Sequence, residues 1–327
     1  MTFNNKTILL TGGTGSFGQK FAKIILRKYK PKSIRIFSRG EFLQWEMEKK
    51  FNNPRLRFLI GDVRDKDRVY RAMKDVDVVV HAAALKHIPV AEYNPIEAVR
   101  TNTLGAVNII DAAIDNGVER AIFISSDKAA NPINLYGATK LCGEKLFIQA
   151  NSYSGGKKTK FSCVRYGNVI GSRGSVVPLF FEQKKKGVLT ITDKRMTRFW
   201  LTLDQGISFV IKCIGKMKGG EIFIPRIPSM KITDLAEVIA PEAKKKLVGI
   251  RPSEKLHEVL LTENETNHSR EFQDYFLIEP EYHYWRKNGI KGGKKLKDGF
   301  SYASDNNGKW LSREQMKKMI KDLEIEK

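Results

Sequence analysis

A tyrosine and a lysine four residues apart form the first pair whose types and spacing could do chemistry. Tyr136 and Lys140 would lie on one face of a helix, because residues four apart are neighbours on a helix surface. A nearby ammonium favours tyrosinate and lowers the pKa of a tyrosine. Tyr136 could then take the proton of a hydroxyl while hydride leaves the same carbon, and Lys140 could also bind a nicotinamide ribose.

An acid and an ammonium stand just before this pair. Asp127 and Lys128 follow an apolar run that ends in Ser125 and Ser126. Two such groups can serve different ends of one bond-breaking event. On the residues alone, a surface ion pair at the start of a helix explains them equally well.

A glycine-rich loop near the start of the chain suits a dinucleotide. Its glycines allow a tight turn, close approach of the backbone to a pyrophosphate and close helix packing, with the phosphates at a helix N-terminus. The loop follows a predicted strand and opens a predicted helix, which is the context that such a motif requires. The expected cofactor contacts in the loop are Gly12, Thr14, Gly15, Ser16, Phe17 and Gly18.

The end of the second predicted strand indicates which dinucleotide is bound. NAD sites usually place an acidic residue there for the ribose 2′-hydroxyl. Ser38 and Arg39 stand there instead and would hold a 2′-phosphate, so NADP is the predicted cofactor. The next two strands end at further expected cofactor contacts, Asp62, Val63 and Ala82.

Alternating strands and helices must position these residues. Short β-branched runs predict strands at 7–10, 33–37, 57–60, 77–80, 121–125 and 161–165. Helical patterns between them cover 16–29, 66–74, 95–116 and 136–151. This alternation is typical of an α/β fold with a doubly wound parallel sheet of the Rossmann type.

The alternation weakens after about residue 168, which predicts two domains. Residues 1–170 would form the NADP-binding domain and residues 171–327 mainly a smaller C-terminal substrate domain, with elements of 201–225 returning to the first sheet. Short helices are expected at 235–239 and 255–261.

Composition and charge restrict the class of protein. No apolar run approaches the roughly 18 residues that span a bilayer, and no signal peptide is recognised, so we expect a cytoplasmic protein without a membrane partner. The three cysteines lack metal-ligand or redox spacing, and no metal is expected. The net charge of +22 suits either nucleic-acid binding or a lysine-rich surface. Scattered lysines without an RNA-binding motif favour the surface and predict no nucleic-acid partner.

Longer motifs carry a resemblance to known enzymes. The glycine loop together with Tyr-x-x-x-Lys resembles the extended short-chain dehydrogenase/reductase family. The string from Asp127 to Lys140 is similar to the soluble, inverting UDP-N-acetylglucosamine 4,6-dehydratases of pseudaminic acid biosynthesis, as are residues 84–89, 165–169, 196–200 and 249–258. Ser253 departs from the glycine that the family often has. Related membrane-anchored dehydratases often have Met where Tyr136 stands, which favours the soluble type.

The resemblance implies a reaction and the roles of residues. NADP would take hydride from C4 of UDP-N-acetylglucosamine, water would leave across C5 and C6, and hydride would return to C6, with inversion at C5. Asp127 would protonate the departing C6 hydroxyl, and Lys128, with a pKa lowered by burial, would remove the C5 proton. The implied substrate contacts are Lys86 (also a cofactor contact), Ser125, Ser126, Tyr136, Asn168, Arg198, Arg251 and Glu254. The resemblance also implies a homo-oligomer.

Other activities stay open on the sequence. A C5-retaining nucleotide-sugar dehydratase or a 4-epimerase would use the same scaffold, although an epimerase has no use for an Asp-Lys pair aimed at C5 and C6. A basic nucleic-acid-binding protein is a third alternative. N-acetylglucosamine rests on the resemblance, because no spacing reveals a pocket for an acetamido group.

Overall fold

A ten-stranded sheet forms the centre of the molecule in a computed structural model that describes residues 2–155, 159–172, 174–282, 284–285 and 290–325. Its strands are β1 (Thr7–Thr11), β2 (Ser33–Ser38), β3 (Leu56–Ile60), β4 (Val78–His81), β5 (Arg120–Ile124), β6 (Lys160–Val164), β10 (Ile222–Pro225), β14 (Ser269–Glu271), β15 (Tyr275–Ile278) and β16 (Lys294–Lys295). Their order is β16-β14-β15-β10-β6-β5-β4-β1-β2-β3. Neighbours from β3 to β10 run parallel, and the strands beyond β10 run antiparallel.

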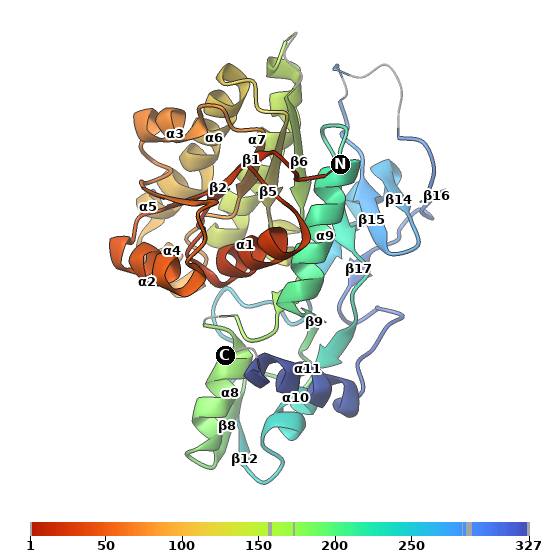
Figure 1. The fold of residues 1–327 in the computed structure, drawn as a ribbon. Coiled ribbons are helices and arrows are strands. Elements are labelled where there is room, and N and C mark those ends of the chain that lie inside the picture. Colours follow the sequence, from red (N-terminus) through yellow and green to blue (C-terminus); the bar gives the residue numbers. More distant parts are fainter. Residues whose placement is uncertain (1, 156–158, 173, 283, 286–289, 326–327) are drawn as a thin grey trace.

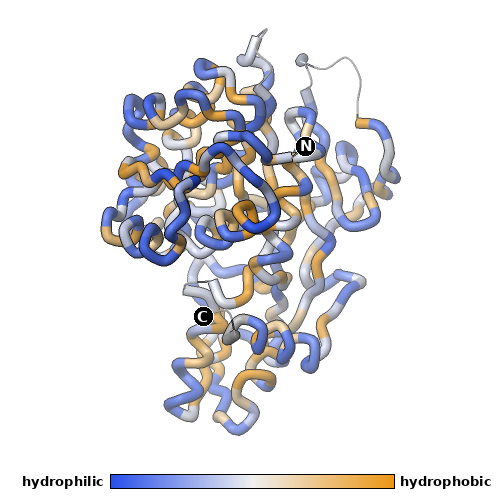
Figure 2. Tube along the Cα trace, in the orientation of Figure 1, coloured by the Kyte–Doolittle hydropathy of each residue, from blue (hydrophilic) through white to orange (hydrophobic). Residues whose placement is uncertain are grey.

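Helices cover both faces of this sheet. They include α1 (Ser16–Lys28), α2 (Glu41–Phe51), α3 (Lys66–Met73), α6 (Gly105–Asp115), α7 (Leu135–Tyr153) and α9 (Leu203–Lys216). In one layer α1 packs beside α9, and in the other α6 packs between α3 and α7 (Figure 1). Strands that are buried on both faces consist of consecutive apolar residues, and the central strands are accordingly hydrophobic along their length (Figure 2). The predicted doubly wound α/β fold is confirmed.

A second, smaller hydrophobic core lies below the sheet in the view of Figure 1. Its elements are β7 (Asn168–Val169), α8 (Val176–Lys184), β8 (Val188–Ile191), β9 (Thr197–Leu201), β11 (Ser229–Lys231), α10 (Ile232–Ile239), β12 (Lys244–Leu247) and α11 (Arg313–Ile325). Phe180, Trp200, Leu235 and Met316 are buried there together. Within the segment 201–225, β10 pairs with β6 and so belongs to the large sheet. The domain boundary at residue 170 stays a prediction.

The structure differs from the sequence prediction in several segments. The helix expected at 255–261 is wrong: its last part is β13 (Val259–Leu261), which pairs with β17 (Tyr302–Ala303) some forty residues later. The helix expected at 95–116 is divided into α5 (Pro95–Val99), the π-helical η1 (Arg100–Leu104) and α6. Helix α2 was not predicted, because only Gln44 and Met47 on it are buried and no apolar stripe marks it.

The part of the chain that the structure describes holds no helix that is both long and apolar enough to cross a membrane.

Candidate active site

A pocket of about 920 Å³ opens at the carboxyl ends of the parallel strands. This is where doubly wound sheets bind ligands. Every predicted catalytic residue lines it, and so does every predicted cofactor residue except Gly18. Of the predicted substrate contacts, Lys86, Ser125, Ser126, Tyr136 and Asn168 line the pocket.

The glycine loop is shaped for close backbone approach. Gly12 has a φ of +66°, and a Cβ on it would lie 3.0 Å from the backbone of Ala83. A Cβ on Gly18 would lie 2.3 Å from the carbonyl oxygen of Gly13, so only glycine lets α1 pack this tightly on the loop. Gly15 begins α1 without a side-chain cap, and the first turn contains no acid. The free N–H groups there suit a phosphate.

The far end of the pocket is lined by the residues after β2 and β3. The exposed Arg39 guanidinium lies 3.9 Å from Asp62 Oδ2, and Asp62 also accepts hydrogen bonds from Arg64. Gly40 is the N-cap of α2 and offers no side-chain hydrogen bond, and the first turn of α2 holds the acid Glu41. This end therefore combines an exposed cation with a second helix N-terminus that has no side-chain cap.

A close contact brings Tyr136 beside the acid and ammonium pair. Asn134 caps α7 by accepting a hydrogen bond from the Gly137 amide at 2.8 Å. A Cβ on Gly137 would lie 2.2 Å from the carbonyl oxygen of Lys128, in the short helix η2 (Asp127–Ala129). Glycine at this position therefore lets the first turn of α7 lie directly on η2.

Lys140 does not act on Tyr136 as the four-residue spacing predicts. Its ammonium donates to the carbonyl oxygen of Ile124 at 2.5 Å and lies 3.7 Å from the centre of the Phe123 ring. Burial raises the pKa of Tyr136, and the partial lowering comes from Lys128 and a hydrogen bond with Ser126. The prediction that Lys140 lowers the pKa of Tyr136 is wrong, because the groups that act on this pKa are Lys128, Ser126 and Asp127.

Lys128 lies between two buried carboxylates. Its Nζ is 3.0 Å from Asp127 Oδ1 and 3.2 Å from Glu258 Oε1. Burial alone would lower the pKa of Lys128, but the two carboxylates outweigh it and hold that pKa well above its usual value. Lys128 is thus an ammonium here, which corrects the expectation that burial makes it neutral. Burial and Glu258 together raise the pKa of Asp127.

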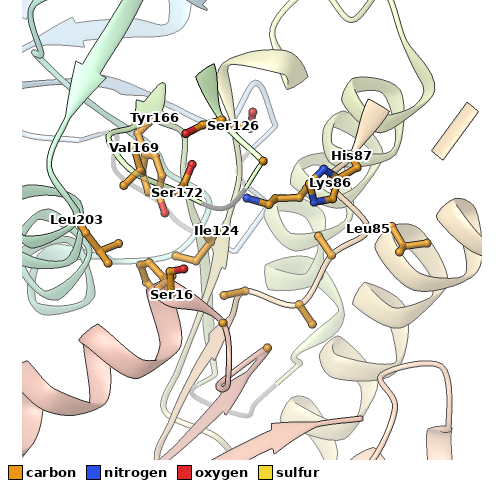
Figure 3. Close-up of a pocket in the computed structure, with 18 of the residues that line it drawn as sticks. Ser16, Leu85, Lys86, His87, Ile124, Ser126, Tyr166, Val169, Ser172 and Leu203 are labelled. Carbon is orange, nitrogen blue, oxygen red and sulfur yellow. The ribbon is translucent and has the colours of Figure 1, made fainter. Parts of the chain in front are cut away.

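Lys86 extends into the pocket from the segment after β4, toward the side lined by Ser126 and Tyr166 (Figure 3). The backbone beside it is held by Asn102, in the π-helical η1. The amide of Asn102 accepts from Leu85 N at 2.8 Å and donates to Leu85 O at 2.9 Å and to Thr139 Oγ1 at 3.0 Å. Sequence reasoning missed Asn102, although π-helical turns are frequent at functional sites.

Several buried polar atoms in the pocket have no hydrogen-bond partner among the described residues. They are Thr101 Oγ1, Ser125 Oγ, Asp127 Oδ2, Asn168 Oδ1 and Ser175 Oγ. Buried polar groups are nearly always paired, so an unpaired set around one cavity indicates a polar ligand.

Arg198, Arg251 and Glu254 are not among the described residues that line the pocket. Arg198 is buried, and its guanidinium donates to the carbonyl oxygens of Thr197, Leu256 and Lys255. Glu254 lies 3.5 Å from it. Arg251 is exposed, in a segment that reaches α7 through a hydrogen bond from Asn134 to Ser253 O.

Other residues that line the pocket were not predicted. The run from 170 to 175 contributes Gly174, where a Cβ would lie 2.4 Å from His87; residue 173 lies outside the described residues. In the sequence, the glycines and serines of this run were the feature that could have indicated a loop lining the pocket. Thr202, Met319 and Asp322 also line the pocket. Met319 and Asp322 come from α11, at the far end of the chain, where no motif marks them.

Comparisons with known proteins agree with this geometry. The model of the polysaccharide biosynthesis protein family matches residues 8–280. The chain is 52% identical to the UDP-N-acetylglucosamine 4,6-dehydratase (inverting) of Campylobacter jejuni, over 98% of this chain and 99% of that protein. It is 40% identical to a UDP-glucose 4-epimerase of Rickettsia conorii, over 98% of this chain and 97% of that protein.

Solved structures share the fold. Pen from Bacillus thuringiensis matches with a TM-score of 0.89 and 41% identity, over 98% of this chain and 100% of that chain. DesIV from Streptomyces venezuelae, a dTDP-glucose 4,6-dehydratase solved with NAD bound, matches with a TM-score of 0.69 over 76% of this chain and 86% of that chain. At 22% identity the DesIV match shows the fold alone.

Proposed function

Since the chain belongs to the polysaccharide biosynthesis protein family, we propose that it is an inverting UDP-N-acetylglucosamine 4,6-dehydratase. The observation that carries the proposal is the meeting of Asp127, Lys128 and Tyr136 in one pocket with the glycine loop. The 52% identity to an enzyme of that name over almost the whole chain supports it.

The pocket fits a nicotinamide dinucleotide, and we propose NADP. The open N-terminus of α1 and the Cβ-free approach at Gly12 suit the pyrophosphate. Ser38 and Arg39 suit a 2′-phosphate, because arginine forks match phosphate oxygens. When bound, the nicotinamide would accept hydride from C4 of the sugar and return it to C6.

The substrate would occupy the part of the pocket between η2 and β7. Ser125 and Asn168 offer unpaired polar atoms there. For the diphosphate we propose Arg251, which is exposed near the start of α7. Arg198 already serves three carbonyl oxygens, so its role is to hold the segment 255–258.

Tyr136 would remove the proton of the C4 hydroxyl. Its phenol lies within reach of the Lys128 charge and of Ser126, both of which favour tyrosinate. Burial opposes ionisation, so the base is the tyrosinate that remains once the phenol of Tyr136 has released its own proton to solvent. Lys140, whose amino group donates to the carbonyl oxygen of Ile124, would bind the nicotinamide ribose.

Asp127 and Lys128 could become acid and base in one proton transfer. Lys128 Nζ is 3.0 Å from Asp127 Oδ1, so the ammonium can pass a proton to the carboxylate. The neutral amine then takes the C5 proton, which the C4 ketone acidifies. The C5–H electron pair forms the C5–C6 double bond, and O6 leaves as water with the proton from Asp127.

Incubation with UDP-N-acetylglucosamine tests the proposal. The product should be lighter by one water, with no added reductant and no release of NADPH. Tyr136→Phe should stop the oxidation at C4 while thermal unfolding stays normal, since the fold does not depend on the hydroxyl. Steady accumulation of free NADPH would instead show a simple dehydrogenase.

A 4-epimerase is the second candidate, favoured by the 40% identity to the Rickettsia enzyme. An epimerase needs Tyr136 and Lys140 but not the Asp127 and Lys128 pair. Its product would keep the substrate's mass, and Lys128→Ala would retain turnover. The dehydratase proposal predicts loss of turnover in that variant with cofactor binding retained.

A further inference from the structure

The buried amide of Gln44 lies under the residues that would meet the cofactor's 2′-phosphate. Gln44 is 4% exposed and projects from α2 toward the ends of β2 and β3. Its Nε2 lies 3.0 Å from each of three oxygens: Ser38 O, Ser38 Oγ and Leu59 O. The buried side chain of Gln44 thus contacts Ser38, a predicted cofactor residue, directly.

The two carbonyl oxygens decide how the amide is oriented. A backbone carbonyl can only accept a hydrogen bond, so the group of Gln44 that faces Ser38 O and Leu59 O must be the NH₂. That NH₂ can only donate, and its two hydrogens face three oxygens, so one hydrogen is shared between two of them. In the third contact Ser38 Oγ is therefore an acceptor. The hydroxyl proton of Ser38 is left for another acceptor.

The acceptor that fits is a phosphate oxygen. Ser38 and Arg39 both line the pocket, and the uncapped N-terminus of α2 follows them at Gly40. Although the acid Glu41 lies in the first turn of α2, a hydroxyl donor, a guanidinium and a helix N-terminus are three features that favour an anion. A ribose hydroxyl would gain less from them, because it carries no charge.

We propose that Gln44 is a specificity-determining positioning residue, which turns the Ser38 hydroxyl proton toward the 2′-phosphate of NADP and so favours NADP over NAD. The inference deepens the cofactor part of the proposed function and rests on it. Gln44 does not touch the cofactor itself; it acts through Ser38.

Direct binding of NADP⁺ and NAD⁺ to the full-length chain tests this without turnover. Gln44→Met keeps the size of the side chain but cannot donate. Its Kd for NADP⁺ should rise about tenfold, the loss expected for one hydrogen bond to a charged group, and its Kd for NAD⁺ should change little. Isothermal titration calorimetry supplies both constants.

A double-mutant cycle with Ser38→Ala separates this role from simple support of α2. Once the hydroxyl is gone, Gln44→Met should no longer change the ratio of the two constants. Met47→Ala is the matched control, because Met47 is the other buried residue of α2 and packs in the main hydrophobic core. This variant should raise the Kd values for NADP⁺ and NAD⁺ by the same factor.

Three results would overturn the inference: an unchanged ratio in Gln44→Met, additive effects of Gln44→Met and Ser38→Ala on the ratio, or an equal change of ratio in Met47→Ala. A wild-type chain that binds NAD⁺ as tightly as NADP⁺ would overturn the choice of NADP as well. A failure of the dehydratase proposal alone would leave these binding constants unaffected and would appear only in the sugar product.

Discussion

The ammonium of Lys140 donates a hydrogen bond to the backbone carbonyl of Ile124 at 2.5 Å, where α7 crosses the end of β5. Burial lowers the pKa of Lys140 to about 7, although Glu144 opposes the shift. The unfolded chain therefore binds more protons than the folded chain between about pH 7 and the ordinary lysine pKa of 10.5.

Lys140 should make the free energy of unfolding rise with pH in that interval. Lys140→Met removes the titrating group, so the advantage in stability of the wild type over the variant should grow from pH 7 to pH 10. Thermal unfolding of the cofactor-free proteins at a series of pH values measures it. A difference that shrinks as the pH rises would contradict the lowered pKa of Lys140.

Glu258→Gln should move to lower pH those limbs of the pH profile of kcat that Asp127 and Lys128 control. The carboxylate of Glu258 lies 3.2 Å from Lys128 Nζ, and its charge raises the pKa of both Lys128 and Asp127. Removal of that charge lowers both pKa values, so each limb that Asp127 or Lys128 controls moves to lower pH. Glu271→Gln, at a surface pair with Arg226, is the control and should leave the profile unchanged. A shift to higher pH would contradict the arrangement.

Removal of the Arg198 side chain should affect mainly stability, and removal of the Arg251 side chain should affect mainly substrate binding. Arg198→Ala leaves buried carbonyl oxygens without their donor and removes one of the cations beside Glu258, so it should cost about 3 kcal/mol in the free energy of unfolding. Arg251→Ala, at an exposed position, should change that free energy by less than about 0.5 kcal/mol and raise KM instead. Chemical denaturation and steady-state kinetics separate the two effects. Equal losses of stability would contradict these roles.

The sequence predicted the parts of the site that lie within one segment. The glycine loop after β1 and the Tyr136 and Lys140 turn on α7 follow from local spacing, and both line the pocket. The charge of Lys128 did not follow, because only its neighbour Asp127 is visible along the chain. Glu258 reaches the same ammonium from 130 residues away, and only the folded chain brings it there.

Tertiary pairing also explains the errors in the fold. Residues 259–261 form a strand because Tyr302 and Ala303 pair with them. A local sequence pattern does not indicate a pairing partner that far away in the chain. Gln44 was missed for a related reason: a glutamine on a mostly exposed helix looks like a surface residue until its carbonyl partners on β2 and β3 are known. Assembly into a homo-oligomer and the absence of a nucleic-acid partner stay predictions.

The most direct test of the central claim is the product formed from UDP-N-acetylglucosamine in deuterated water, measured by mass spectrometry and NMR at the earliest times. The account predicts a 4-keto-6-deoxy sugar that has lost one water, carries one deuterium at C5 and has the L-arabino configuration. Lys128→Ala should form none of it. A product of unchanged mass would contradict the dehydratase, and a first product that retains the configuration at C5 would contradict the inverting reaction.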